Sequence, residues 1–226
     1  MEVVKTENVK KIYPAPSGAV HALDGVSISI EEGEFAAIIG ASGSGKTTLL
    51  NLLGGLDVPT EGTVTVRGRN LEKLSQEELT VFRRRNIGFV FQNYNLLPIL
   101  NVTENITLPL KLDGAGLDEA FFVQVVETLG LSDKLYNMPE TLSGGQQQRV
   151  AIARALITKP AVILADEPTG NLDSKTGIEV IGLLKASAAR FGQTMVIVTH
   201  NEEVAQMADT MIRIEDGKVK GSSDEK

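Results

Sequence analysis

Short apolar runs rich in Val, Ile and Phe recur along the chain, and each of them predicts a β-strand. Segments with apolar residues every three or four positions lie between these runs and predict helices. The predicted strands cover residues 26–30, 35–39, 63–66, 87–91, 161–165 and 194–199. The predicted helices cover residues 46–54, 118–129, 143–158 and 174–191. Strands that alternate with helices are typical of an α/β fold with a buried, mostly parallel sheet.

Residues 102–142 differ from the rest of the chain, because they show helical patterns and no strong strand. We expect them to form an α-helical subdomain inserted into the α/β core. The sequence shows no internal repeat and no low-complexity tract. It therefore predicts one continuous domain over residues 1–226.

Composition excludes several classes of protein. The 226 residues include no cysteine, which excludes a disulfide framework and a thiolate metal site. A net charge of −7 argues against nucleic acid as a partner, because phosphate backbones attract basic proteins. No apolar run approaches the roughly 20 residues that span a bilayer, and neither end shows a targeting or lipidation signal. We expect a cytoplasmic protein without direct membrane insertion, which reaches a membrane only through a partner.

A phosphate-binding pattern follows the predicted strand 35–39. Residues 40–47, GASGSGKT, match G-x-x-x-x-G-K-[ST] and lead directly into a predicted helix. The backbone N–H groups of such a loop converge on phosphate oxygens. We expect Lys46 to contact the β and γ phosphates of a nucleoside triphosphate and the Thr47 hydroxyl to contact Mg²⁺. The residues expected around the phosphates are Gly40, Ala41, Ser42, Gly43, Ser44, Gly45, Lys46, Thr47 and Thr48.

Two adjacent carboxylates, Asp166 and Glu167, end the apolar run AVILADE. This arrangement is costly at the edge of an apolar core unless a ligand uses the carboxylates. Because successive side chains of a strand point to opposite faces, we expect Asp166 to face Mg²⁺ and Glu167 to polarise the attacking water as a general base. The alternative is that both side chains cap the following loop.

His200 follows the predicted strand 194–199. In a parallel sheet its side chain is expected at the same edge as Glu167, where it would hydrogen-bond the γ-phosphate and hold the water. A lone histidine at a strand end is also often a structural residue. Its place one strand beyond the acid pair favours the functional interpretation.

A second candidate phosphate-binding site is the run LSGGQQQR, residues 142–149, before a long predicted helix. Ser143 is suited to cap this helix, and two glycines leave its N-terminus open to an anion. One chain has little use for a second γ-phosphate site, whereas a symmetric dimer can lend it to the nucleotide of the neighbouring subunit.

Together, these motifs resemble the nucleotide-binding domain of ABC transporters, over nearly the whole chain and in the order of that family. GASGSGKT resembles its Walker A motif, FVFQN its Q-loop, LSGGQ its signature, VILADE its Walker B motif and NLD its D-loop. His200 stands at the place of its switch histidine.

The resemblance implies a P-loop NTPase core with a mostly parallel sheet, an N-terminal antiparallel β part and an inserted helical subdomain. That subdomain would cover residues of about 93–142 together with the signature helix. The resemblance also implies that Tyr13 stacks on adenine and that Gln92 contacts Mg²⁺. Further nucleotide-binding residues that it implies are Ser143, Gly145, Gln146 and Asp173. The cofactors it implies are ATP and Mg²⁺.

In the implied mechanism, ATP binding closes a homodimer and hydrolysis reopens it, which drives an integral membrane permease. The protein would then lie at the inner face of the cell membrane through that permease. The phrases NYNLLPILNVTENITLPL and ADEPTGNLDS resemble the branch of the family that serves macrolide export, lipoprotein release and resistance to antimicrobial peptides.

A loop rich in apolar residues carries Leu96, Leu97, Ile99 and Leu100 around Pro98. Such a loop either packs inside the helical subdomain or forms an interface. The resemblance implies that a cytoplasmic coupling helix of the permease covers it.

Other functions of the same fold are possible interpretations. A soluble ABC ATPase of DNA repair or translation usually has two cassettes or a coiled-coil insertion, and neither is visible. A nonhydrolysing regulatory module would have lost its base, whereas Glu167 and His200 are both present. The sequence does not separate an exporter from a force-transmitting ATPase of a cell-division or envelope complex.

Overall fold

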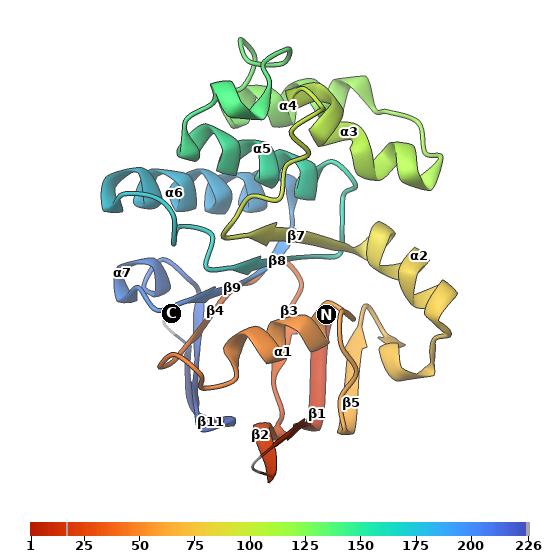
Figure 1. Cartoon of the computed structure of the whole chain (residues 1–226), viewed down its shortest axis with the longest axis vertical. Helices are drawn as coiled ribbons and strands as arrows, with labels where there is room; N and C mark the ends of the chain where they lie inside the picture. The colour runs from red at the N-terminus through yellow and green to blue at the C-terminus, as the bar shows by residue number, and fades with distance from the viewer. Residues whose placement is uncertain (17, 225–226) are drawn as a thin grey trace. The chain divides into compact units, whose positions relative to one another are not determined.

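The computed structural model describes residues 1–16 and 18–224 of the chain. Contacts divide it into two compact units. Unit 1 consists of Met1–Arg83 and Thr194–Lys226, and unit 2 consists of Arg84–Gln193. Figure 1 follows the chain through its helices and strands. The single domain over residues 1–226 and the helical subdomain at about 93–142 stay predictions.

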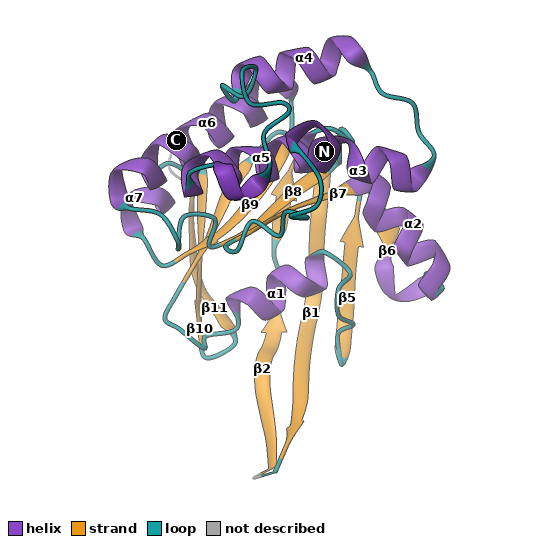
Figure 2. Cartoon of the chain, turned by 45° about the horizontal axis from the view of Figure 1, so that its top comes forward, coloured by secondary structure: helices purple, strands orange, loops and turns teal. Residues whose placement is uncertain are grey.

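Unit 1 begins with an antiparallel sheet. Its strand order is β2-β1-β5-β6, and β3 pairs with β1. The strands are β1 (Glu2–Ala15), β2 (Gly18–Val26), β3 (Ser29–Glu31), β5 (Glu61–Val66) and β6 (Arg69–Asn70). The pairing of β1 with β5 ends at Lys10 and Glu61, whereas β1 continues beside β2 to Ala15. β1 and β2 form the long hairpin seen in Figure 2. The N-terminal antiparallel part implied by the family resemblance is therefore present.

The predicted strand over residues 26–30 is wrong, because β2 ends at Val26 and β3 begins at Ser29. The buried side chain of Thr6 explains the interruption. Its hydroxyl donates to the Val26 carbonyl and accepts from the Ile28 N–H at 3.0 Å. A side chain thus replaces ladder hydrogen bonds at this point.

Unit 1 also contains a parallel group of strands. β4 (Phe35–Ile39) pairs in parallel with β9 (Thr194–Thr199) and with β10 (Thr210–Glu215), and β11 (Lys218–Asp224) is antiparallel to β10. Every residue of β4 and β9 is buried, which explains their continuous apolar sequences. The helices of this part of the chain are α1 (Lys46–Leu53), η1 (Leu71–Lys73), α2 (Gln76–Asn86), which continues into unit 2, and α7 (Glu202–Ala205).

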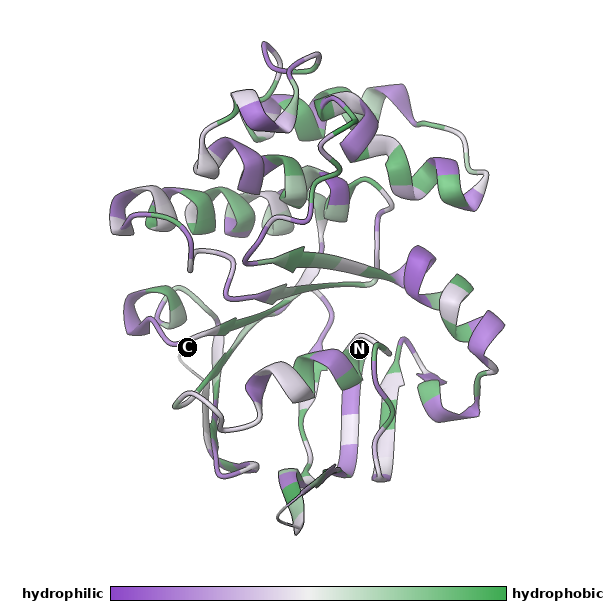
Figure 3. Ribbon diagram, in the orientation of Figure 1, coloured by the Kyte–Doolittle hydropathy of each residue, from purple (hydrophilic) through white to green (hydrophobic). Residues whose placement is uncertain are grey.

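Unit 2 contains two parallel strands and most of the helices. β7 (Ile87–Phe91) pairs with β8 (Val162–Asp166), and both are mainly hydrophobic in Figure 3, although β8 ends at the polar residue Asp166. The helices are α3 (Val102–Asp113), α4 (Glu119–Thr128), η2 (Pro139–Thr141), α5 (Gly144–Leu156) and α6 (Ser174–Phe191). β7 and α6 confirm the predicted ranges 87–91 and 174–191, and residues 102–142 are mainly helical as predicted.

One buried amide organises the apolar loop that precedes α3. Asn105 is fully buried on α3, and its Oδ1 accepts from the Leu97 N–H at 2.8 Å. Its Nδ2 donates to the carbonyls of Leu97, Leu100 and Asn101 at 3.1, 2.8 and 3.1 Å. The loop is therefore fixed through its backbone, while the side chains of Leu97 and Ile99 are 42% and 81% exposed.

We expect Asn105→Ala to lower the free energy of unfolding by about 1–3 kcal/mol, because the substitution leaves buried backbone groups without a partner. Lys111→Ala is the matched control, since Lys111 is exposed on the same helix and should change stability by less than about 0.5 kcal/mol. Urea denaturation measures both effects. An unchanged midpoint for Asn105→Ala would show that the amide does not hold the loop.

Candidate functional site

The loop between β4 and α1 is the centre of the candidate site in unit 1. β4 ends at Ile39, and α1 begins at Lys46. Gly45 precedes the helix with a φ of 108° and has no side chain with which to cap the first N–H groups. N–H groups at a helix N-terminus lack intrahelical acceptors and favour an anion. The loop is therefore suited to bind phosphate.

The side chains of Lys46 and Ser44 place an ammonium group and a hydroxyl group inside this loop. Lys46 is only 6% exposed, and its Nζ donates to the carbonyls of Gly40 at 2.9 Å and Ala41 at 2.7 Å. The Ser44 hydroxyl is buried and has no hydrogen-bond partner among the residues that the structure describes. A phosphate oxygen accepts hydrogen bonds from both kinds of donor, so these groups fit an anionic ligand.

The back of the loop lies against the main chain of other segments of unit 1. A Cβ atom at Gly40 would overlap the Ile214 carbonyl oxygen, and one at Gly45 would overlap the Ala22 carbonyl oxygen. Both glycines are therefore needed for close packing, in addition to their positive φ angles.

Tyr13 lies half-buried on β1, beside this loop. Its hydroxyl donates to Asp57 Oδ2 at 2.7 Å and also hydrogen-bonds the side chain of Thr48 from α1. The structure thus brings the predicted stacking residue to the helix that follows the phosphate-binding loop.

His200 leaves the same sheet edge as Gly40. β4 and β9 are in parallel register with Ile39 opposite Thr199, so the next residue of each strand lies at one edge. The histidine side chain is exposed there. His200 thus follows the carboxyl end of its strand in unit 1, whereas Glu167 belongs to unit 2, and the shared edge of these two residues stays a prediction.

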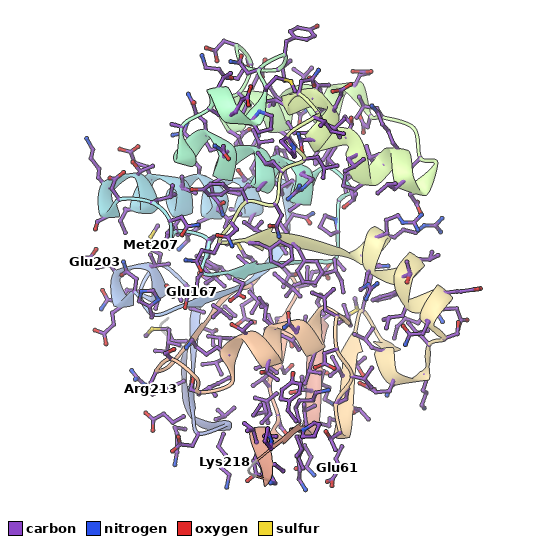
Figure 4. All side chains as sticks on the ribbon, viewed as in Figure 1. Glu61, Glu167, Glu203, Met207, Arg213 and Lys218 are labelled. Atoms are coloured by element: carbon purple, nitrogen blue, oxygen red, sulfur yellow. The ribbon has the colours of Figure 1, made fainter. Side chains whose placement is uncertain are left out.

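In unit 2, parallel register aligns Gln92 with Glu167. Phe91 lies opposite Asp166 at the ends of β7 and β8, and the two site residues follow directly. Asp166 and Glu167 are both half-buried. Figure 4 shows Glu167 just beyond the end of β8.

The prediction that Asp166 and Glu167 point apart because they alternate on a strand is wrong in its reasoning. β8 ends at Asp166, and Glu167 has a φ of 43°, in the left-handed region. A residue in this region does not follow strand alternation, and such a conformation costs of the order of 1–3 kcal/mol. Strained residues of this kind gather at functional sites.

Ser143 caps α5, as predicted. Its hydroxyl accepts from the Gln146 N–H at 3.4 Å, and the Gln146 side chain accepts from the Ser143 N–H at 2.9 Å. Gly145 is buried between them in the first turn. This capping box leaves Ser143 exposed at the helix N-terminus.

Asp173 caps α6 by accepting from the Thr176 N–H at 3.1 Å. Hydrogen bonds from the side chain and backbone of Thr176 lower the pKa of Asp173. The carboxylate is exposed, so it is accessible at the start of the helix.

Comparison with known proteins identifies the family. The family model described as ABC transporter matches residues 23–170. The chain belongs to the ABC transporter family. An uncharacterized ABC transporter ATP-binding protein from Thermotoga maritima is 48% identical over 222 residues, which cover 97% of this chain and 94% of the relative.

Two further matches add the fold and the domain context. The macrolide export ATP-binding/permease protein MacB of Bdellovibrio bacteriovorus is 45% identical over 99% of this chain, which spans only 34% of that relative. A dimeric structure of the ATP-binding cassette MJ0796 of Methanocaldococcus jannaschii, in a post-hydrolysis state bound to ADP and Pi, gives a TM-score of 0.87. It shares 44% identity over 98% of both chains. The expected α/β fold of an ABC ATPase is thus confirmed.

Within this ABC chain, Asn171 joins the segment after Gln92 to the segment before Asp173. Its Nδ2 donates to the Gln92 carbonyl at 3.0 Å and to Asn93 Oδ1 at 2.8 Å, and its Oδ1 accepts from Gln92 Nε2 at 3.2 Å. Asn171 was not among the residues predicted from the sequence. Its position two residues before Asp173 was the one available signal.

Arg154 was also missed. It extends from α5 to the carbonyls of Tyr94 at 2.7 Å and Asn95 at 2.6 Å, and burial lowers its pKa. The signal in the sequence is an arginine inside the apolar helical run VAIARAL. The signature helix, α5, is therefore hydrogen-bonded through Arg154 to the loop that begins at Gln92.

The predicted metal ligands fit Mg²⁺ bound to a nucleotide. Thr47, Gln92 and Asp166 provide a hydroxyl, an amide oxygen and a carboxylate, which are hard oxygen ligands. Among residues 1–16 and 18–224, no cluster of three or more His, Cys, Asp or Glu side chains is arranged to hold a metal ion. Mg²⁺ at nucleotide sites takes most of its ligands from phosphate and water, so a protein cage is not required.

We expect Gly45→Ala to destabilise the protein more than Gly43→Ala. Both positions have positive φ, at 108° and 77°, but a Cβ atom at Gly43 would meet nothing within 4 Å. Gly43→Ala should therefore cost only about 1–2 kcal/mol for the left-handed conformation. Gly45→Ala should cost at least about 1 kcal/mol more, from overlap with the Ala22 carbonyl. Equal denaturation midpoints for the two variants would contradict the close packing.

Proposed function

We propose that this chain is the ATP-binding and ATP-hydrolysing subunit of an ABC transporter, working as a homodimer with a separate membrane permease. The observation on which the proposal depends is the loop of residues 40–45 at the uncapped N-terminus of α1, with Lys46 buried inside it. Membership of the ABC transporter family and the ADP and Pi in the MJ0796 cassette support ATP as the ligand.

ATP would bind with its phosphates in this loop, where Lys46 and the first N–H groups of α1 contact the β and γ phosphates. The hydroxyls of Ser42, Ser44 and Thr48 and the backbone of Gly40, Ala41, Gly43 and Gly45 would surround the same phosphates. Tyr13 would stack on the adenine, a contact worth roughly 1–3 kcal/mol. Thr47, Gln92 and Asp166 would hold Mg²⁺, which offsets negative charge on the phosphates when bound.

Glu167 would orient and polarise the attacking water, and His200 would hydrogen-bond the γ-phosphate. Two observations support these roles: each residue directly follows the end of a parallel strand, and Glu167 has a strained backbone. The proton of the water would pass toward the Glu167 carboxylate as the new oxygen–phosphorus bond forms and the bond between the γ phosphorus and the bridging oxygen breaks, which leaves ADP and phosphate.

The second subunit would complete the site with Ser143, Gly145 and Gln146 at the N-terminus of α5, next to Asp173. The exposed cap of α5 and the dimeric form of the related MJ0796 cassette support this arrangement. ATP binding would then close the dimer, and loss of the γ-phosphate would open it.

The permease would dock on unit 2. A groove of about 330 Å³ there is lined by Ile87, Phe89, Phe91, Pro109 and Arg154 among other residues. The exposed side chains of Leu97 and Ile99 belong to the same unit. The MacB relatives are ATP-binding/permease proteins of which this chain spans about a third, 34% in one case. Export, lipoprotein release or resistance to peptide antibiotics would be the process served.

No helix among the described residues is long and apolar enough to cross a membrane. The MacB relatives, which are ATP-binding/permease proteins, support a place at the inner face of the cell membrane through contact with the permease. Nucleic acid plays no part in this proposal, in line with the net charge of −7.

Glu167→Gln should lower ATP turnover by about 10²- to 10⁴-fold, because the amide cannot accept a proton from the water. The variant should elute as a dimer in size-exclusion chromatography with ATP and as a monomer without it. Glu179→Gln, an exposed carboxylate on α6, is the matched control and should keep full turnover. An elution volume of Glu167→Gln that ignores ATP would count against the closing dimer.

Ser143→Arg should bind ATP normally and lose turnover. The substitution removes the contact that Ser143 of one subunit would make with the nucleotide of the other subunit, and it leaves the phosphate-binding loop of each subunit unchanged. Lys46→Ala should instead lose ATP binding. Ser75→Arg is the control, because Ser75 forms a similar reciprocal cap with Glu78 on α2. Isothermal titration and phosphate release measure the two properties. Normal hydrolysis by Ser143→Arg would refute the shared site.

A further inference from the structure

Asp57 accepts hydrogen bonds from three residues: Lys11, Tyr13 and Val58. Its Oδ1 accepts from Lys11 Nζ at 2.6 Å and from the Val58 N–H at 2.7 Å, and its Oδ2 accepts from the Tyr13 hydroxyl at 2.7 Å. Lys11 Nζ also donates to the Val58 carbonyl at 2.7 Å. All of these residues belong to unit 1. The network is therefore a compact set of bonds around one phenol.

Lys11 also covers one face of the aromatic ring. Its Nζ lies 4.9 Å from the ring centroid of Tyr13, within the range of a cation–π contact. The side chain of Lys11 is only 13% exposed, so the ammonium group is fixed in place. One face of the ring is thus occupied, and the hydroxyl end is bound to Asp57 and Thr48.

The protonation states of Asp57 and Tyr13 favour the hydrogen bond between them. Burial raises the pKa of Asp57, but hydrogen bonds from Lys11 and Tyr13 outweigh it and hold the pKa below the ordinary value. Burial and the bond to Asp57 raise the pKa of Tyr13, so the phenol keeps the proton that it donates. Asp57 is therefore an ionised acceptor beside a neutral phenol at neutral pH.

We propose that Asp57 is a positioning residue for adenine: it fixes the Tyr13 ring with Lys11 over one face, so that the base would stack on the opposite face. This inference rests on the proposed function, since it needs ATP in the phosphate-binding loop and its base on Tyr13. A side chain that is already ordered loses no rotamer freedom when the ligand binds, so the affinity for the base increases.

The test compares two Mg²⁺-bound ligands by isothermal titration: ATP, and inorganic tripolyphosphate, which has the phosphates without the base. Asp57→Ala should raise the Kd for ATP by about 2- to 10-fold and leave the Kd for tripolyphosphate unchanged. Asp57→Asn should restore most of the affinity, because its amide oxygen accepts from the phenol. Glu61→Ala is the matched control, since Glu61 pairs with Lys10 at 2.7 Å on the neighbouring strand (Figure 4).

A double-mutant comparison separates positioning from a structural role. Asp57→Ala should have no further effect on ATP affinity when Tyr13→Ala is already present. Equal loss of affinity for both ligands, or the same loss in the Tyr13→Ala background, would overturn the inference and leave the proposed function intact. Wild-type protein that binds neither ligand would instead overturn the proposed function itself, and the inference with it.

Discussion

Main-chain atoms that pack against the back of the phosphate-binding loop determine its shape. Carbonyl oxygens of Ala22 and Ile214 leave no room for a side chain at Gly45 or Gly40. The Gly217 N–H donates to the Ser44 carbonyl at 3.0 Å, and the Gly217 carbonyl accepts from the Asp24 N–H at 2.8 Å. These backbone contacts fix the shape of the loop, and every proposed contact with phosphate depends on that shape.

Parallel strand register places the remaining residues of the site. Gly40 and His200 follow Ile39 and Thr199, which are paired, and Gln92 and Glu167 follow the paired Phe91 and Asp166. Each unit therefore brings two chemically distinct side chains or loops to one edge of its own strands. This is the edge where ligands bind in open α/β sheets.

Local signals explain what the sequence could predict. β4 and β9 are buried along their whole length, β7 is a continuous apolar run, and α6 has a cap at Asp173 and a left-handed Gly192 at its end. β1 and β10 were missed because they mix polar and apolar residues, and each pairs with a distant strand as well as with its neighbour along the chain. Asn171, Arg154 and Asp57 were missed for a similar reason, since their partners lie 79, 59 and 44 residues away.

The hydrogen bonds of Arg154 connect the loop after Gln92 to the helix α5, whose other end is capped by Ser143. Ser143 caps one end of α5 and Arg154 lies near the other, so the helix spans about 16 Å between these two residues. Both bonds of Arg154 end on main-chain carbonyls, at Tyr94 and Asn95. A main-chain carbonyl is present whatever the residue, so the two hydrogen bonds that join α5 to this loop require no particular acceptor side chain at either position.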